Sequence, residues 1–227
     1  KTRAEENPSD EETISVEEMY KLDLAFDDNL QFTGMPIIPS ERPIQLSVGW
    51  NWIGYLPSAD LPIDDALSTI GTDLDYIKGQ GGYADYYDGW GWFGTLATMS
   101  PYQGYMLDVA NPDILVYPDG SGLARTVSNY ELNALDFNYR DYEYNGSITA
   151  TINIDDIVIS DSDMLIAYTG DECRGYVSPL LFPLTGGYIF PIMLYSNEQY
   201  GDNIRFEYYN NYLNKYYTLN RDVSFES

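Results

Sequence analysis

The stretch "MLIAYTGDECRGYV", residues 164–177, contains two short apolar runs with a turn sequence between them. The same region is rich in polar groups, because the only cysteine of the chain, Cys173, follows two acidic residues and precedes Arg174. Two interpretations compete: a polar site for a metal or a nucleophile, and the corner of a β fold. We predict two strands joined by a tight turn, with Gly170 and Gly175 shaping the backbone.

The sequence around this stretch has the alternating pattern that is typical of a β-sheet protein. From about residue 130 onward, runs that alternate apolar and polar residues follow one another closely, among them "SITATINI", "GYIFPIMLYS" and "NIRFEYY". Turn sequences such as "NG", "TGDE" and "LTGG" separate these runs, and no helical pattern interrupts them. Residues 130–227 are therefore predicted to form an antiparallel β-sandwich.

The part of the chain before the sandwich is predicted to be a second, small β-rich domain over residues 19–118. Strands are expected in residues 44–57 and a hairpin in residues 104–118, because apolar and polar residues alternate there. The sequence "LPIDDALSTI", residues 61–70, is the one good helix candidate, with Asp60 as its cap. An acidic, flexible tail over residues 1–18 and a linker over residues 119–129 complete the predicted organisation.

The first domain contains an internal repeat. Met19–Phe32 aligns with Gly104–Tyr117, and the two share their tyrosine, leucine, aspartate and alanine positions. No "GWNWIGY" segment precedes the first copy, so we expect the chain to begin in the middle of a repeat, as a piece of a longer array would. The hairpin over 19–36 then needs a partner, either the 104–118 hairpin or a neighbouring subunit. Chance likeness between two amphipathic hairpins is the alternative.

Composition excludes several classes of function. The chain has 36 acidic and 11 basic residues, a net charge of −25, which disfavours nucleic acid and anionic membranes as partners. No apolar run approaches the length of a membrane span. The absence of histidine removes the usual general base, and a single cysteine cannot form an internal disulfide. Any bound metal would have oxygen ligands, which favours calcium.

The acidic residues near the opening stretch are the candidate calcium ligands. They lie in predicted turns at one end of the sandwich, where loops can bring carboxylates together: Asp155, Asp156, Asp161, Asp163 and Asp171. The alternative is that these side chains are solvated or bond to the backbone of their own turns. A second candidate is the "DYYDGWGW" segment, with Asp85 and Asp88.

No residue is predicted to be catalytic. Cys173 lacks a histidine partner, and Asp171 and Glu172 would raise the pKa of its thiol, so we interpret it as a small buried side chain. Arg174 is expected to form ion pairs with Asp161, Asp163 or Asp171.

Four tryptophans are the candidate ligand-binding residues. They occur as two pairs at spacing i, i+2, which should place each pair on one face of its strand: Trp50, Trp52, Trp90 and Trp92. Exposed indoles in this arrangement could stack on sugar rings. The alternative is an aromatic core in a small domain.

Two strings, "GWNWIGY" and "GDECRG", make the chain resemble a known arrangement over residues 18–227. It is similar to a repeat followed by an Ig-like module near the ends of very large secreted bacterial surface proteins. The resemblance implies an extracellular, non-catalytic module of a surface appendage, filament or layer, with copies of itself or neighbouring surface domains as partners. A carbohydrate-binding adhesin module is the alternative function.

Overall fold

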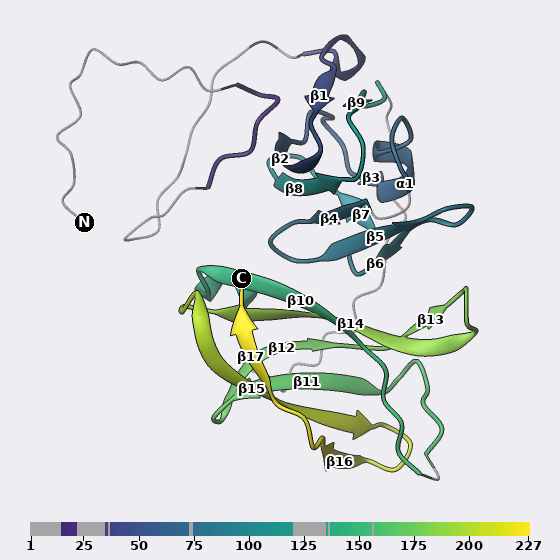
Figure 1. Ribbon diagram of the computed structural model, residues 1–227, viewed down its shortest axis with the longest axis vertical. Helices are drawn as coiled ribbons and strands as arrows, with labels where there is room; N and C mark the ends of the chain where they lie inside the picture. The colour runs from purple at the N-terminus through teal and green to yellow at the C-terminus, as the bar shows by residue number, and fades with distance from the viewer. Residues whose placement is uncertain are drawn as a thin grey trace, which may run out of the picture.

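Two β-rich units are stacked along the long axis of the computed structural model (Figure 1). The structure describes residues 15–21, 35, 37–72, 75–119, 135, 137–155 and 157–227. Most of the predicted tail, of the first predicted hairpin and of the predicted linker therefore lies outside the described residues. Within the described part, the chain is mainly β with one short α-helix, which confirms the predicted fold class.

The first unit is built on a five-stranded antiparallel sheet. In spatial order its strands are β2 (Gly49–Gly54), β8 (Gly104–Val109), β4 (Tyr76–Lys78), β5 (Tyr83–Tyr87) and β6 (Gly91–Gly94). Successive side chains alternate between the two faces, and one face buries Ile53, Ile77 and Leu107 in the core of this unit. The opposite face includes Tyr76 and is partly covered by the second unit.

Short elements close the core of the first unit. They are η1 (Pro39–Glu41), β1 (Ile44–Leu46), β3 (Leu61–Pro62), α1 (Ile63–Ala66), β7 (Thr98–Met99) and β9 (Asp113–Leu115). Strand β1 pairs with β9, and β3 pairs with β7. The predicted 104–118 hairpin is therefore wrong, because β8 and β9 belong to different sheets. Ile44 and Leu115 are paired and both buried, so burial of this distant pair replaces the local hairpin.

The helix is shorter than predicted. Its expected first residues form strand β3, in which Leu61 pairs with Met99, and both side chains are buried. The N-cap of α1 is Pro62 and no side chain caps it, so the predicted capping role of Asp60 is wrong. Burial of the β3–β7 pair outweighs the weak helix propensity of the segment.

The second unit contains two antiparallel sheets. One has the order β10 (Tyr144–Ala150), β14 (Gly187–Ser196), β13 (Leu180–Phe182). The other has β12 (Glu172–Val177), β11 (Met164–Thr169), β15 (Tyr200–Asn210) and β16 (Lys215–Thr218), with β17 (Val223–Glu226) also paired to β15. Side chains from both sheets share one core, including Leu165, Phe190 and Phe206, so the unit is sandwich-like. A short helix, η2 (Tyr139–Asp141), precedes β10.

The stretch 164–177 forms the predicted pair of strands, β11 and β12, joined at Gly170 and Asp171. Gly170 has φ +59°, a conformation that other residues adopt at a cost. The register shifts by one residue because Ala167 pairs with Gly175 and Tyr168 with Cys173. This β-bulge makes Arg174 the extra residue and turns it inward.

Tyrosine side chains join the two units. The hydroxyl of Tyr76 lies 2.8 Å from Ser147 Oγ, and that of Tyr83 lies 2.7 Å from Thr149 Oγ1. From the other direction, the Tyr195 hydroxyl donates to the carbonyl of Gln80 at 2.9 Å. Because these contacts are spread over two strands of each unit, they restrain rotation of one unit against the other.

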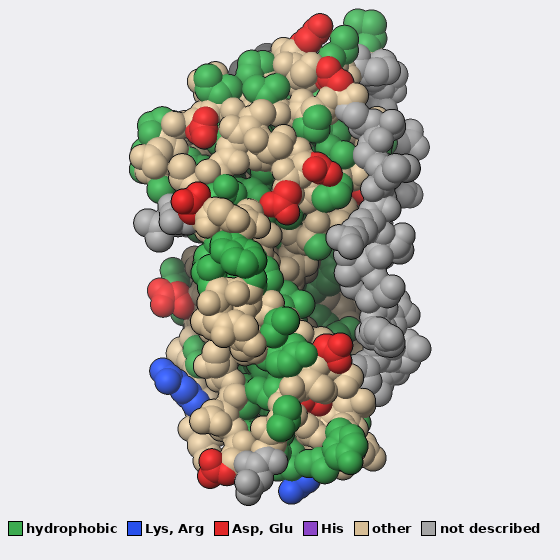
Figure 2. Space-filling view, turned by 90° about the vertical axis from the view of Figure 1, so that its right-hand side faces the viewer, with side chains coloured by type: hydrophobic (Ala, Val, Ile, Leu, Met, Phe, Trp, Pro, Cys, Tyr) green, Lys and Arg blue, Asp and Glu red, His purple; other side chains and the backbone are tan. Residues whose placement is uncertain are grey.

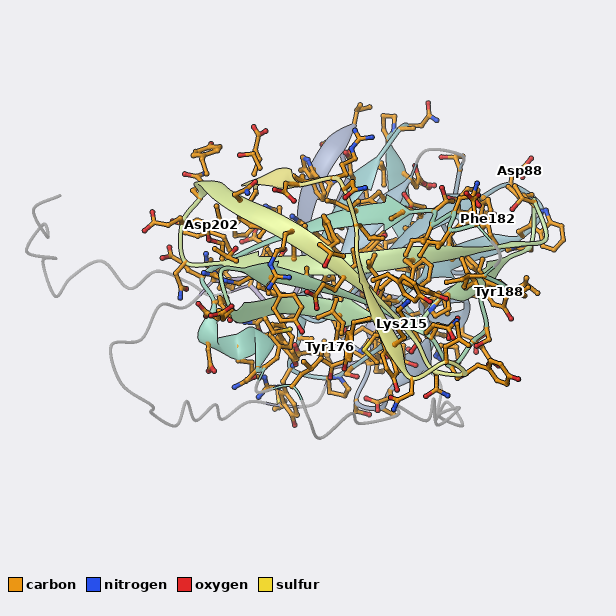
Figure 3. All side chains as sticks on the ribbon, turned by 90° about the horizontal axis from the view of Figure 1, so that it is seen from below. Asp88, Tyr176, Phe182, Tyr188, Asp202 and Lys215 are labelled. Carbon is orange, nitrogen blue, oxygen red and sulfur yellow. The ribbon has the colours of Figure 1, made fainter. Side chains whose placement is uncertain are left out.

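Aromatic rings extend this junction toward one end of the molecule. Phe182 packs against the rings of Tyr87 and Phe93 at centroid distances of 5.2 and 5.5 Å, and Figure 3 shows it at the end that also carries Asp88. Hydrophobic side chains gather between the units on the face seen in Figure 2, where acidic side chains outnumber basic ones.

A tyrosine in the first core is expected to be replaceable by phenylalanine without loss. Tyr117 is fully buried, and its hydroxyl has no hydrogen-bond partner among the described residues. Tyr117→Phe should leave the free energy of unfolding unchanged or raise it by up to about 1 kcal/mol in urea titrations. Tyr208→Phe is the matched control, expected to lose about 2 kcal/mol because that hydroxyl donates to Asp163. A comparable loss in both variants would contradict the prediction.

Candidate functional site

The outer edge of strand β2 holds a short N-terminal segment as an added strand. Gly54 N donates to the carbonyl of Glu17 at 3.0 Å, and Met19 N donates to the carbonyl of Trp52 at 3.4 Å. Between these bonds, Glu18 and Ile53 form an antiparallel bridge. Edge strands present unpaired backbone groups that bind extended segments. Residues 17–19 therefore occupy a strand-addition site.

Two glycines permit this close approach. A Cβ at Gly54 would overlap the carbonyl oxygen of Val16, and a Cβ at Gly104 would overlap the side chain of Met19. The overlap at Gly54 is with backbone, which cannot swing aside as a side chain can. Gly54 and Gly104 were not identified from the sequence as parts of this site. A glycine inside a strand often marks a place where another backbone approaches closely, and the glycine that ends "GWNWIG" could have indicated this.

The segment continues from β2 toward the second unit. The Lys21 ammonium donates to the carbonyl of Glu143 at 3.0 Å and lies 5.0 Å from the ring centroid of Tyr144. The described start of the predicted 19–36 hairpin thus contacts β2 and the second unit. Residues 22–34 and 36 of that hairpin lie outside the described residues, so its pairing with residues 104–118 stays a prediction.

The tryptophans divide between surface and core. Trp50 and Trp52 share one face of β2 and are 49 % and 46 % exposed. Trp90 lies in the turn after β5 and is 59 % exposed, whereas Trp92 of β6 is 7 % exposed and packs against Tyr86 in the core. The prediction of a shared face therefore holds for the first pair and is wrong for the second. Trp90 lies in the β5–β6 turn, outside any strand, so strand alternation does not place it on the same face as Trp92.

Other side chains on the face of Trp50 were not identified from the sequence. The Tyr76 ring lies 5.8 Å from the Trp50 ring, edge to face, and the Lys78 ammonium lies 5.7 Å from the same ring. Asp108 is paired with Trp50 and with Tyr76, so it lies between them.

Two charged side chains on the same face are partly buried. Burial lowers the pKa of Lys78 and raises that of Asp85, because both charged groups lose contact with water. The alternation of apolar and polar residues along β4 and β8 could have indicated which side chains lie on this face.

The candidate calcium ligands are dispersed. Asp155, Asp161 and Asp171 are exposed, Asp163 is fully buried, and Asp156 lies outside the described residues. Of the residues that the structure describes, no three acidic, cysteine or histidine side chains gather to hold a metal ion, including those around the second candidate, Asp85 and Asp88. Among the described residues, these carboxylates are therefore not gathered into one cluster.

Asp163 instead binds protein donors on both of its oxygens. Its Oδ2 accepts from Ser160 N at 2.8 Å and from the Tyr208 hydroxyl at 2.6 Å. Its Oδ1 accepts from Asn211 N at 2.9 Å. Burial and proximity to this carboxylate raise the pKa of Tyr208 to about 12. This carboxylate fastens the turn before β11 to the end of β15.

Arg174 is paired differently from the sequence prediction. It forms ion pairs with Glu172 at 3.3 Å and with Asp202 at 3.4 Å, and it donates to the carbonyl of Tyr195 at 3.3 Å. Figure 3 places Asp202 at the end of the second unit away from Phe182. The predicted pairs with Asp161, Asp163 or Asp171 are absent among the described contacts, because the β-bulge turns Arg174 toward β14.

Cys173, beside this arginine, is buried among Met164 and Ile166. Burial raises the pKa of its thiol, which disfavours the nucleophilic thiolate.

Comparisons with protein families, curated proteins and solved structures found no match to this chain. No helix in the described part of the chain is long and apolar enough to cross a membrane. The strand-addition site at β2 and the sheet face beside it are the candidate functional surfaces of the described residues.

Proposed function

We propose that the chain is a non-catalytic structural module of an extracellular bacterial surface appendage, filament or layer, which associates with copies of itself or with neighbouring surface domains. The observation that carries this proposal is the strand added to the edge of β2 by residues 17–19. Such a segment can bind the same edge on a second copy, because its backbone hydrogen bonds are independent of which chain supplies it. A head-to-tail contact of this kind generates open filaments.

Two further features support a structural role. The tyrosine contacts at Ser147 and Thr149 join the units over a broad junction, which suits a module that transmits force. The resemblance of "GWNWIGY" and "GDECRG" to segments of large secreted surface proteins supports a location outside the cell.

The proposal predicts that Gly54→Ala abolishes self-association. The added methyl group would overlap the carbonyl oxygen of Val16 and push the segment off β2. Wild-type chains at rising concentration should form assemblies in light scattering and electron microscopy at physiological ionic strength, which screens the charge of −25. Gly54→Ala, and a chain that starts at residue 37, should remain monomeric.

Gly187→Ala is the matched control for this substitution. A Cβ at Gly187 would meet Thr185 Oγ1 at 3.6 Å, an ordinary contact, so this variant should associate like the wild type. Strictly monomeric behaviour of the wild type at high concentration, with and without calcium, would refute self-association. Assemblies of Gly54→Ala equal to those of the wild type would refute strand addition as the mechanism.

A further inference from the structure

The sheet face that carries Trp50 and Trp52 takes no part in the strand addition. Strand addition uses the backbone edge of β2, whereas both indoles project from the face of the sheet. The second unit contacts this face at Tyr76 of β4 and at Tyr83 of β5. Trp50 and Trp52 are 49 % and 46 % exposed, so an aromatic core does not account for these two residues.

Neighbouring side chains support the Trp50 ring in a defined position. Tyr76 contacts it edge to face at 5.8 Å, at an interplanar angle of 88°. The hydroxyl of Tyr76 is in turn bonded to Ser147 of the second unit, which restrains that ring. A restrained indole loses little conformational entropy when a ligand stacks on it.

Polar groups of both kinds lie beside the ring. Lys78 places its ammonium 5.7 Å from the Trp50 centroid and forms no ion pair with a carboxylate of the described residues. Its N–H groups can donate to a ligand. Asp108, paired with Trp50 across the sheet, provides carboxylate oxygens that can accept. Binding sites typically combine aromatic surface with a few such polar groups.

We infer that this face binds a neutral polysaccharide, with pyranose rings stacked on Trp50 and Trp52 and hydroxyl groups bonded to Lys78 and Asp108. The apolar C–H face of a pyranose matches an exposed indole, and its hydroxyl groups both donate and accept hydrogen bonds. The net charge of −25, with Asp85 and Asp108 on the same face, repels acidic polysaccharides.

The test is affinity electrophoresis of the full chain in gels that contain a neutral β-glucan, α-mannan or β-galactan, or polygalacturonate as the acidic probe. At least one neutral polysaccharide should retard the wild type, and polygalacturonate should not. Trp50→Ala and Trp52→Ala should each weaken binding at least about tenfold, because truncation of a central aromatic contact has an effect of this size. Lys78→Met should weaken it severalfold.

Trp90→Ala is the matched control, since Trp90 is also exposed but lies in the β5–β6 turn. It should bind like the wild type, and Trp50→Phe should recover part of the binding lost in Trp50→Ala. Melting curves of each variant separate loss of binding from loss of folding. Failure of all neutral probes, equal losses in Trp50→Ala and Trp90→Ala, or preference for polygalacturonate would overturn the inference. Self-association is measured separately, so either result can fail alone.

Discussion

Asp163→Ala is expected to lower the free energy of unfolding by about 3–5 kcal/mol, because it leaves one buried and two part-buried donors without their acceptor. The Tyr208 hydroxyl and the backbone N–H groups of Ser160 and Asn211 all donate to this carboxylate. Alanine offers none of them an acceptor, and Asp163 is fully buried, so water cannot readily replace it. Urea unfolding should show a lower midpoint with an unchanged slope.

Asp161→Ala is the control for this experiment, because Asp161 is exposed two residues away. Its effect should stay within about 0.5 kcal/mol. The loss in Asp163→Ala should be the same in calcium and in EDTA, since the partners of Asp163 are protein groups. A loss that appears only in calcium would show that Asp163 serves as a metal ligand instead.

Gly175→Ala is expected to cost about 3 kcal/mol, near the upper end of overpacking effects. A Cβ at this position would overlap the carbonyl oxygen of Met193 in β14, and that backbone lies in the middle of a sheet. The two sheets of the second unit would have to separate locally, which also disturbs the Arg174 bond to the Tyr195 carbonyl. Thermal and urea unfolding measure the loss.

Gly175 also has a positive φ, of +150°, and Gly170→Ala is the comparison that has positive-φ strain without a steric contact. Gly170 has a positive φ of +59°, but a Cβ there would meet no atom within 4 Å. Its cost should be about 1–2 kcal/mol, from left-handed backbone strain alone. If Gly175→Ala cost no more than Gly170→Ala, steric contact with β14 would not be the reason for glycine at 175.

Local patterns predicted the β elements well. Strands β11 and β12 lie where apolar runs flank "TGDE", and their turn at Gly170 is the predicted one. In β11 the apolar run is continuous because both faces are covered: Leu165 enters the sandwich core, and Ile166 enters a second cluster with Cys173. The burial of Cys173 also matches the prediction.

The candidate site could be predicted only in part. Spacing i, i+2 correctly placed Trp50 and Trp52 on one face, but the same spacing in "GWGW" spans a turn and a strand. The sequence could not show that Lys78, Tyr76 and Asp108 lie beside Trp50. They are far from it in the chain, and β2, β4 and β8 meet only in the folded sheet.

The sequence by itself determined the mainly β class, the sandwich-like second unit, the hairpin over 164–177 and the burial of Cys173. These follow from composition and from alternation with period two, which are local properties. Tertiary structure assigned the partner of each strand and each charge: β9 pairs with β1 rather than β8, Arg174 with Asp202, and residues 17–19 with β2. The physical reason is that burial and backbone pairing between distant segments contribute more free energy than local turn and helix preferences.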